Sequence, residues 1–95
     1  MLLLLTEIKE KIEPILKNAG ITKSGIFGSY VRGEANENSD VDILVDFPTG
    51  TTLFDVAKLR YKLEDALSKP VDIVGYKNIK PALKEYILSE QVPIL

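Results

Sequence analysis

Residues 28–45 read GSYVRGEANENSDVDILV, and this stretch decides how the chain is expected to fold. It follows a strand-like apolar run, passes through a glycine-serine turn and a polar loop, and ends in a second apolar run. Asp40 and Asp42 stand at the start of that second run, although aspartate is depleted in strands. Because alternate residues of a strand share a face, the two carboxylates should point the same way and repel each other. A divalent metal ion would relieve that repulsion.

The composition limits both the size of the fold and the chemistry open to it. The 95 residues allow one small domain, expected over residues 1–95. With 12 basic and 14 acidic residues the net charge is −2, so there is no bulk electrostatic reason to bind nucleic acid. Cysteine and histidine are absent, which excludes disulfides, thiolate catalysis, Cys/His zinc sites and imidazole triads. An enzyme of this composition would depend on carboxylates, a hard metal ion, basic side chains and hydroxyls.

The N-terminus resembles a fragment of a signal peptide. It lacks a basic n-region and a cleavage site, and charged residues follow from Glu7 onward. The longest apolar run is far shorter than the roughly 20 residues that cross a bilayer. We therefore expect a cytoplasmic protein in which Leu2 to Leu5 pack against the domain or against a partner chain.

Hydrophobic periodicity and turn residues predict helices and strands in the order α-β-β-α-β-α, with one short helical turn in addition. The predicted elements are a helix over 6–19, a strand over 21–27, a helical turn over 29–33, a strand over 41–47, a helix over 52–68, a strand over 71–74 and a last helix that begins at Pro81. In that last helix, Leu83, Ile87 and Leu88 are expected to form the inner face. Residues 92–95 are expected to form a short apolar tail.

Individual residues indicate where the predicted helices begin and end. Thr6 suits the N-cap of the first helix, and Gly20 suits the position just after its C-terminus. Pro14 lies inside this helix and should kink or divide it. Thr52 and Asp55 match a capping box, in its looser form, at the start of the helix over 52–68.

The candidate site constrains the topology of the sheet. Gly28 ends the first strand and Asp42 begins the second, so the two meet only if these strands run antiparallel. Asp72 begins the third strand and joins them only if that strand runs parallel to the second, with the helix over 52–68 as the crossover. We therefore expect an α+β fold, an α/β sandwich in which a small mixed three-stranded sheet is backed by helices.

Three carboxylates in such an arrangement can hold one or two Mg²⁺ ions that also bind the phosphates of a substrate. The alternative is that Asp40, Asp42 and Asp72 are solvated residues at strand ends. The glycine-serine turn favours the metal site. Gly28 allows a ligand to approach the backbone closely, and a short helix beginning at Ser29 would offer amide groups to a phosphate.

The combined motif resembles the signature of the polymerase-β-like nucleotidyltransferase superfamily, a Gly-Ser turn followed by an Asp-x-Asp strand. It is most similar to the minimal nucleotidyltransferases, the MNT proteins of prokaryotes. The residues that carry this resemblance are Gly28-Ser29-x-x-Arg32-Gly33-x-Ala35-x-x-x-Ser39-Asp40-x-Asp42. The resemblance extends over essentially the whole chain, including Asp72 and the short helix that follows it, and implies a palm-like fold. Val31, where many relatives have alanine, is a conservative difference.

The resemblance implies a mechanism for these residues. Asp40, Asp42 and Asp72 would bind two Mg²⁺ ions together with the triphosphate of ATP, and Asp72 would help to deprotonate the acceptor hydroxyl. Ser29 and the amide groups beside Gly28 would bind the β- and γ-phosphates. The hydroxyl would attack the α-phosphorus, and pyrophosphate would leave.

Arg32 has two interpretations. It would contact a phosphate of the nucleotide, or it would order the polar loop by pairing with Glu34, Glu37 or an aspartate. The resemblance alone does not choose between these roles.

The resemblance also implies a partner. MNT proteins are typically encoded beside a helical HEPN protein, a ribonuclease-type toxin, and act as its antitoxin by transferring AMP from ATP to a tyrosine hydroxyl of the toxin. Nucleic acid is not the expected acceptor, because the chain has no additional acceptor domain and no basic excess. The alternative is a binding module that neutralises the toxin by masking its surface, with Leu2 to Leu5 and Val92 to Leu95 as the interface. The intact aspartates favour the enzyme.

Overall fold

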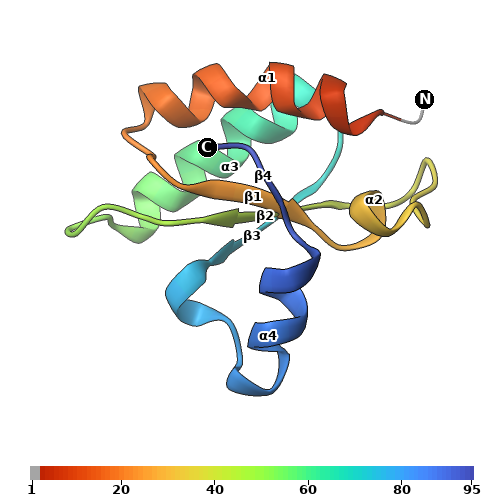
Figure 1. The fold of residues 1–95 in the computed structure, drawn as a ribbon. Helices are drawn as coiled ribbons and strands as arrows, with labels where there is room; N and C mark the ends of the chain where they lie inside the picture. The colour runs from red at the N-terminus through yellow and green to blue at the C-terminus, as the bar shows by residue number, and fades with distance from the viewer. Residues whose placement is uncertain (1–2) are drawn as a thin grey trace.

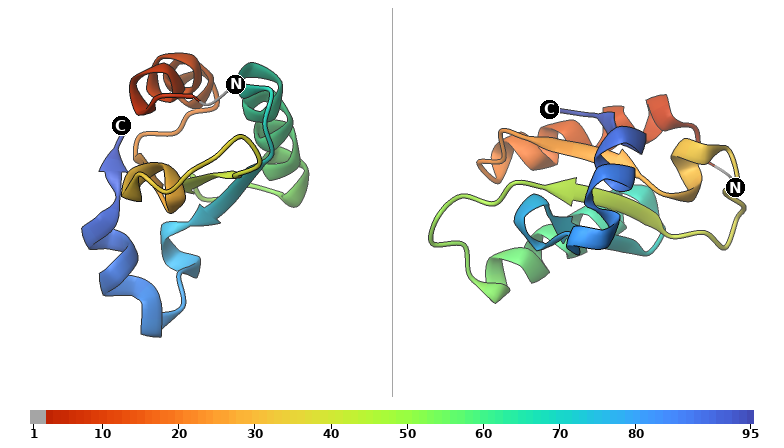
Figure 2. Two further views of the ribbon diagram at one scale, coloured as in Figure 1. Left: turned by 90° about the vertical axis from the view of Figure 1, so that its right-hand side faces the viewer. Right: turned by 60° about the horizontal axis from the view of Figure 1, so that its bottom comes forward.

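The computed structural model describes residues 3–95 as a mixed sheet with helices on both faces (Figure 1). Its elements are α1 (Leu5–Asn18), β1 (Ser24–Phe27), α2 (Ser29–Arg32), β2 (Val41–Val45), α3 (Leu53–Leu67), β3 (Val71–Gly75), the 3₁₀ turn η1 (Tyr76–Asn78), α4 (Pro81–Glu90) and β4 (Val92–Pro93). Helices α1 and α3 cover one face of the sheet, and α4 lies on the other side (Figures 1 and 2). The predicted α+β architecture is confirmed. Across residues 3–95 no helix is both long enough and apolar enough to cross a membrane.

The strands have the mixed arrangement that the site required, in the order β3-β2-β1-β4. β1 and β2 pair antiparallel, β2 and β3 pair parallel, and α3 makes the crossover between the parallel pair. The predicted number of three strands was wrong, because β4 adds an antiparallel edge strand beside β1. β4 is only two residues long and contains Pro93, which an edge strand tolerates because its N–H need not enter the ladder. Such a strand has no local sequence signal.

The core lies between the sheet and the helix pair α1 and α3. Its members are apolar and at most 4% exposed: Ile8, Ile12 and Leu16 of α1, Leu59, Leu63 and Leu67 of α3, and Ile26, Val41, Ile43 and Val45 of the strands. Helix residues at this spacing share one face, so each of the two helices buries one side against the sheet. Burial of this face fixes the sheet against two helices and leaves its opposite face for other uses.

Helix α1 differs in two details from its prediction. Its N-cap is Leu4 rather than Thr6, because the Glu7 carboxylate accepts a hydrogen bond from the Leu4 N–H at 3.1 Å. Pro14 does not divide the helix, since the carbonyl of Glu10 that loses a partner lies on the exposed face, where water can bind it. The glycine after the helix has a φ of +79°, as the predicted C-terminal position requires.

The segment before α1 packs partly as expected. Leu3 and Leu5 pack against the core, whereas Leu4 is 63% exposed. Leu2, which belongs to the same prediction, lies outside the described residues.

Helix α4 begins with Pro81 at its first position, as predicted. The prediction of an inner apolar face was wrong for Leu83, which is 49% exposed, while Ile87 and Leu88 are half-buried. The helix lies on the side of the sheet away from the main core, so it has little apolar surface to cover. Its C-terminus instead approaches the loop between β1 and α2.

Candidate functional site

Two of the three predicted aspartates face each other across the parallel strands. Asp42 of β2 and Asp72 of β3 are register partners, so their side chains lie on the same face of the sheet. Their neighbours Val41 and Ile43 point into the core on the other face. Asp40 immediately precedes β2, and its charge acts on Asp42. The structure thus brings the three predicted carboxylates to one edge of the sheet.

The electrostatics at Asp42 show how close these charges lie. Its partial burial, followed by the charges of Asp72 and Asp40, raises the pKa of Asp42 to about 6 despite the opposing effect of Arg32. The charges of Asp72 and Asp40 therefore make ionisation of Asp42 less favourable, a situation that a bound cation reverses.

The donor set fits Mg²⁺, provided that the ion shares its ligands with a substrate. Mg²⁺ is usually held by one or two carboxylates together with phosphate oxygens and water. Within residues 3–95 no three acidic side chains are already arranged to enclose one ion. Asp40 and Asp72 are exposed and Asp42 is half-buried, so all three can reach a ligand that enters from solvent.

Gly28 brings the backbone directly against Asp42. It has φ +83° and ψ −153°, a region that is essentially restricted to glycine. A Cβ at this position would overlap the Asp42 carboxylate. The residue therefore satisfies two requirements at once, a glycine-only conformation and close contact with the acidic cluster. The sequence predicted that Gly28 would let a ligand approach the backbone; in the structure the group beside it is the Asp42 carboxylate.

Ser29 begins helix α2, the predicted helical turn. The carbonyl of Gly28 accepts hydrogen bonds from the N–H groups of Val31 and Arg32, at 3.0 and 3.1 Å, which close that turn. Ser29 is half-buried, one residue after the glycine that touches Asp42. The glycine-serine turn and the carboxylates therefore form one continuous site.

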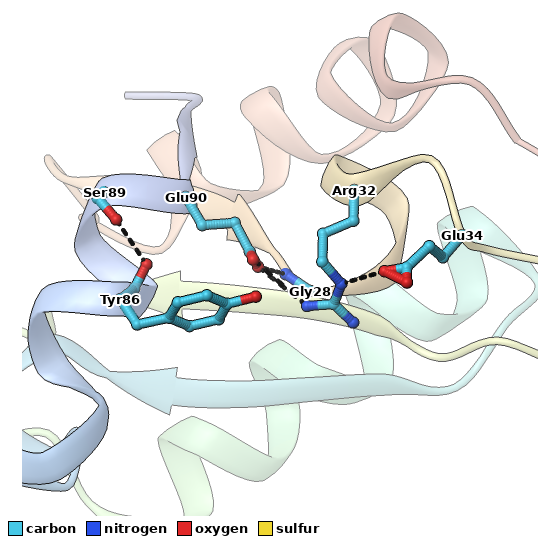
Figure 3. A network of polar contacts seen from close by, with 6 residues as sticks. All are labelled: Gly28, Arg32, Glu34, Tyr86, Ser89 and Glu90. Carbon is cyan, nitrogen blue, oxygen red and sulfur yellow. Dashed lines mark hydrogen bonds and ion pairs between the residues drawn. The ribbon is translucent and has the colours of Figure 1, made fainter.

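The structure adds a residue that the sequence did not indicate, Glu90 at the end of α4 (Figure 3). The N–H of Gly28 donates to Glu90 Oε1 at 2.7 Å, and Arg32 Nη1 lies 3.3 and 3.4 Å from the two carboxylate oxygens. Burial acts to raise the pKa of Glu90, but hydrogen bonds from Gly28, Tyr86 and Arg32 outweigh it and lower the pKa below its ordinary value. The contact joins residues 62 positions apart, so no local pattern could reveal it.

In this structure Arg32 forms ion pairs, which is one of the two roles that the sequence allowed. Its Nε lies 2.6 Å from Glu34 Oε1, and its Nη1 pairs with Glu90 (Figure 3). The hydrogen bond with Glu34 is the main reason that the Arg32 pKa is raised. The Arg32 side chain remains 39% exposed, so one edge of the guanidinium is still accessible.

Comparison with known proteins gives a family model and several relatives. The model, described as “Nucleotidyltransferase domain”, matches residues 5–94, which include every residue predicted for the site. The chain is 50% identical over 91 residues to a Methanocaldococcus jannaschii protein provisionally named a protein adenylyltransferase, covering 96% of this chain and 98% of that protein. It is 42% identical over 91 residues to the protein adenylyltransferase MntA of Thermococcus cleftensis, covering 87% and 92%.

A solved structure has the same fold. It is a crystal structure described as a toxin–antitoxin with AMP-PNP, and it matches with a TM-score of 0.79 and 26% identity. The match covers 92% of this chain and 72% of that one.

Proposed function

The chain belongs to the nucleotidyltransferase domain family, and from this premise we propose that it transfers AMP from ATP to a hydroxyl of a partner protein. The sequence motif indicates this family, and the match over residues 5–94 confirms it. The observation that carries the proposal is the register of Asp42 and Asp72 beside the glycine-only turn at Gly28. Relatives named protein adenylyltransferases support AMP as the transferred group.

The proposed chemistry assigns a task to each residue. Asp40, Asp42 and Asp72 would hold Mg²⁺, which when bound neutralises the triphosphate and lowers the pKa of a nearby hydroxyl. The Gly28 amide and the hydroxyl of Ser29 bind the β- and γ-phosphates. Arg32 offers its guanidinium to the same phosphates.

The transfer step requires no histidine as a base. The acceptor oxygen forms a bond to the α-phosphorus as the bond to the β-phosphate oxygen breaks, and pyrophosphate leaves. Asp72 is exposed and takes the proton of the attacking hydroxyl. The half-buried Asp42 keeps its position because its strand is anchored in the core by Val41 and Ile43.

The acceptor in this proposal belongs to another chain. We assign the acceptor as a tyrosine of a helical HEPN-type toxin, for which this protein acts as the antitoxin. The resemblance to MNT proteins implies this pairing. A matching structure described as a toxin–antitoxin with AMP-PNP supports a nucleotide-binding antitoxin. The same proposal treats residues 1–95 as a single catalytic domain and places the reaction in the cytoplasm.

The experiment that tests this function uses a HEPN-type protein, the proposed partner, as substrate. We expect that Mg²⁺ and ATP labelled on the α-phosphate will transfer label to a tyrosine of that partner, whereas ATP labelled on the γ-phosphate will not. EDTA should abolish the transfer. Labelling from the γ-phosphate would identify a kinase instead.

The second candidate function is a non-catalytic antitoxin that masks its toxin. Leu53 and Phe54, at the start of α3, are 87% and 80% exposed and favour a docking surface. Val92 to Leu95, the tail that the sequence suggested as part of this interface, instead joins the sheet through β4, and Ile94 is only 6% exposed. Neutralisation of toxicity without any labelled partner would support masking and refute the enzyme.

A further inference from the structure

The Glu90 carboxylate occupies the donors that the proposed function assigns to phosphates. Glu90 Oε1 accepts the Gly28 N–H at 2.7 Å, and both carboxylate oxygens lie within 3.4 Å of Arg32 Nη1 (Figure 3). The hydroxyl of Tyr86, on the same helix, also favours the charged form of this carboxylate and lowers its pKa. The Glu90 side chain is only 10% exposed, so it is held inside the site.

A carboxylate and a phosphate cannot share these donors. The Gly28 N–H is a single donor, and Glu90 already uses it at short distance. The charge of Glu90 also helps to raise the pKa of Asp42, so Glu90 interacts electrostatically with the acidic cluster. A triphosphate that entered this site would meet an anion already bound at its own position.

We propose that Glu90 is a built-in competitor for the nucleotide: it binds the Gly28 amide and Arg32 when the site is empty, and the phosphates of ATP displace it. This inference rests on the proposed function, because it takes the turn at Gly28 as the phosphate-binding element. Displacement frees Arg32 from one of its two acidic partners, and the guanidinium then pairs with phosphate while Glu34 holds its Nε.

The displacement is a rotation of the Glu90 side chain rather than a movement of the chain end. Directly after Glu90, Gln91 accepts a hydrogen bond from the Tyr76 hydroxyl at 2.8 Å and packs against Gly25. β4 then pairs with β1, and Ile94 is buried in the core. The backbone that follows Glu90 is therefore anchored, so ATP binding would move the Glu90 side chain and not the backbone.

The test compares nucleotide affinity in the wild type, Glu90→Gln and Glu85→Gln by titration calorimetry with Mg²⁺ present. Glutamine keeps the size of the side chain but removes its charge, so Glu90→Gln should lower the Kd for ATP by roughly fivefold or more, since charge-assisted hydrogen bonds are the strong ones. Glu85 is an exposed residue of the same helix, and Glu85→Gln should leave the Kd within about twofold of wild type. An unchanged or higher Kd in Glu90→Gln would overturn the inference.

AMP is the matched control ligand, because it lacks the β- and γ-phosphates. The gain in affinity of Glu90→Gln should be large for ATP and for inorganic tripolyphosphate, and small for AMP. An equal gain in affinity for AMP would mean that Glu90 does not compete with the β- and γ-phosphates at the turn around Gly28. If the wild type and both variants all fail to bind ATP, the proposed function fails first, and the inference falls with it.

A measurement on the wild type keeps the test valid if Glu90→Gln does not fold. Saturation with ATP should shift both the Gly28 amide resonance and the side-chain carboxyl resonance of Glu90 in NMR spectra. The carboxyl of Glu85 serves as the reference and should not move. ATP binding without any change at the Glu90 carboxyl would overturn the inference while leaving the proposed function intact.

Discussion

Asp42 and Asp72 lie at the same level of two parallel strands, so two carboxylates face the same side of the sheet as direct neighbours. Their backbones are fixed by ladder hydrogen bonds, and Val41, Ile43 and Val71 anchor the strands in or near the core. The fold therefore holds two like charges together rather than letting them separate. A bound cation removes the cost of that arrangement.

We predict that Asp42→Asn abolishes AMP transfer while the protein stays folded. Asparagine preserves the shape of the side chain but loses the charge that a Mg²⁺ ligand needs. Asp65→Asn is the matched control, because Asp65 is exposed on α3 and outside the site, and it should retain wild-type transfer. Labelling of the partner from ATP measures the activity, and circular dichroism checks the fold. Transfer that survives in Asp42→Asn would contradict the assigned metal role.

The raised pKa of Asp42 predicts how stability depends on pH in the metal-free protein. The ordinary pKa is 3.8 and the folded value is about 6, so between these values the folded protein keeps a proton that the unfolded chain has released. Stability due to this group therefore falls as pH rises through that window, and the full cost is present above pH 6.

Asp42→Asn removes this cost and should be more stable than wild type at neutral pH in EDTA. We expect a difference of about 1 kcal/mol, after allowance for the half-exposed side chain, that shrinks as the pH approaches 4. Urea unfolding over a pH series measures it, with Asp65→Asn, which removes an exposed carboxylate of α3, as the matched control. A constant difference at every pH would show that the charge of Asp42 is not the cause.

The sequence predicted the central part of this fold because local chemistry and topology agree there. The core faces of α1 and α3 follow a helical period, and the requirement that Gly28, Asp42 and Asp72 meet fixed which strands run parallel and which antiparallel. These features depend on residue type and order, which a sequence displays directly.

Glu90 and β4 could not be predicted in the same way. Both depend on contacts between distant parts of the chain, 62 positions in the case of Glu90 and Gly28. Glu90 in isolation is an ordinary charged residue at a helix end, and Val92–Pro93 is too short for a strand period. Their partners are fixed only when the tail folds back along β1.

Substitution of Gly28 tests whether backbone contact with Asp42 is essential to the site. Gly20→Ala is the matched control, because Gly20 also has a positive φ but no atom within 4 Å of an added Cβ. Gly20→Ala should cost about 1–2 kcal/mol from the left-handed conformation alone. Gly28→Ala should cost about 1–3 kcal/mol more, since its ψ of −153° places it in a glycine-only region and its Cβ overlaps the Asp42 carboxylate, and should abolish nucleotide binding. Equal losses in both variants, by chemical denaturation, would exclude the overlap.

The C-terminal tail, residues 92–95, should contribute to stability through one residue, Ile94, which directly follows β4. Ile94 is 6% exposed and belongs to the core, and its N–H donates to the Ser24 carbonyl at 2.8 Å. Ile94→Ala should destabilise the protein by about 2–5 kcal/mol through the cavity that it leaves. Val92 is 38% exposed, so Val92→Ala should change stability by less than about 1 kcal/mol.

Because β4 anchors the chain after Glu90, we also expect Ile94→Ala to weaken the Gly28–Glu90 contact, seen as faster hydrogen exchange of the Gly28 amide. Unfolding by urea and amide exchange measure the two effects, and equal losses from both variants would contradict a core role for the tail.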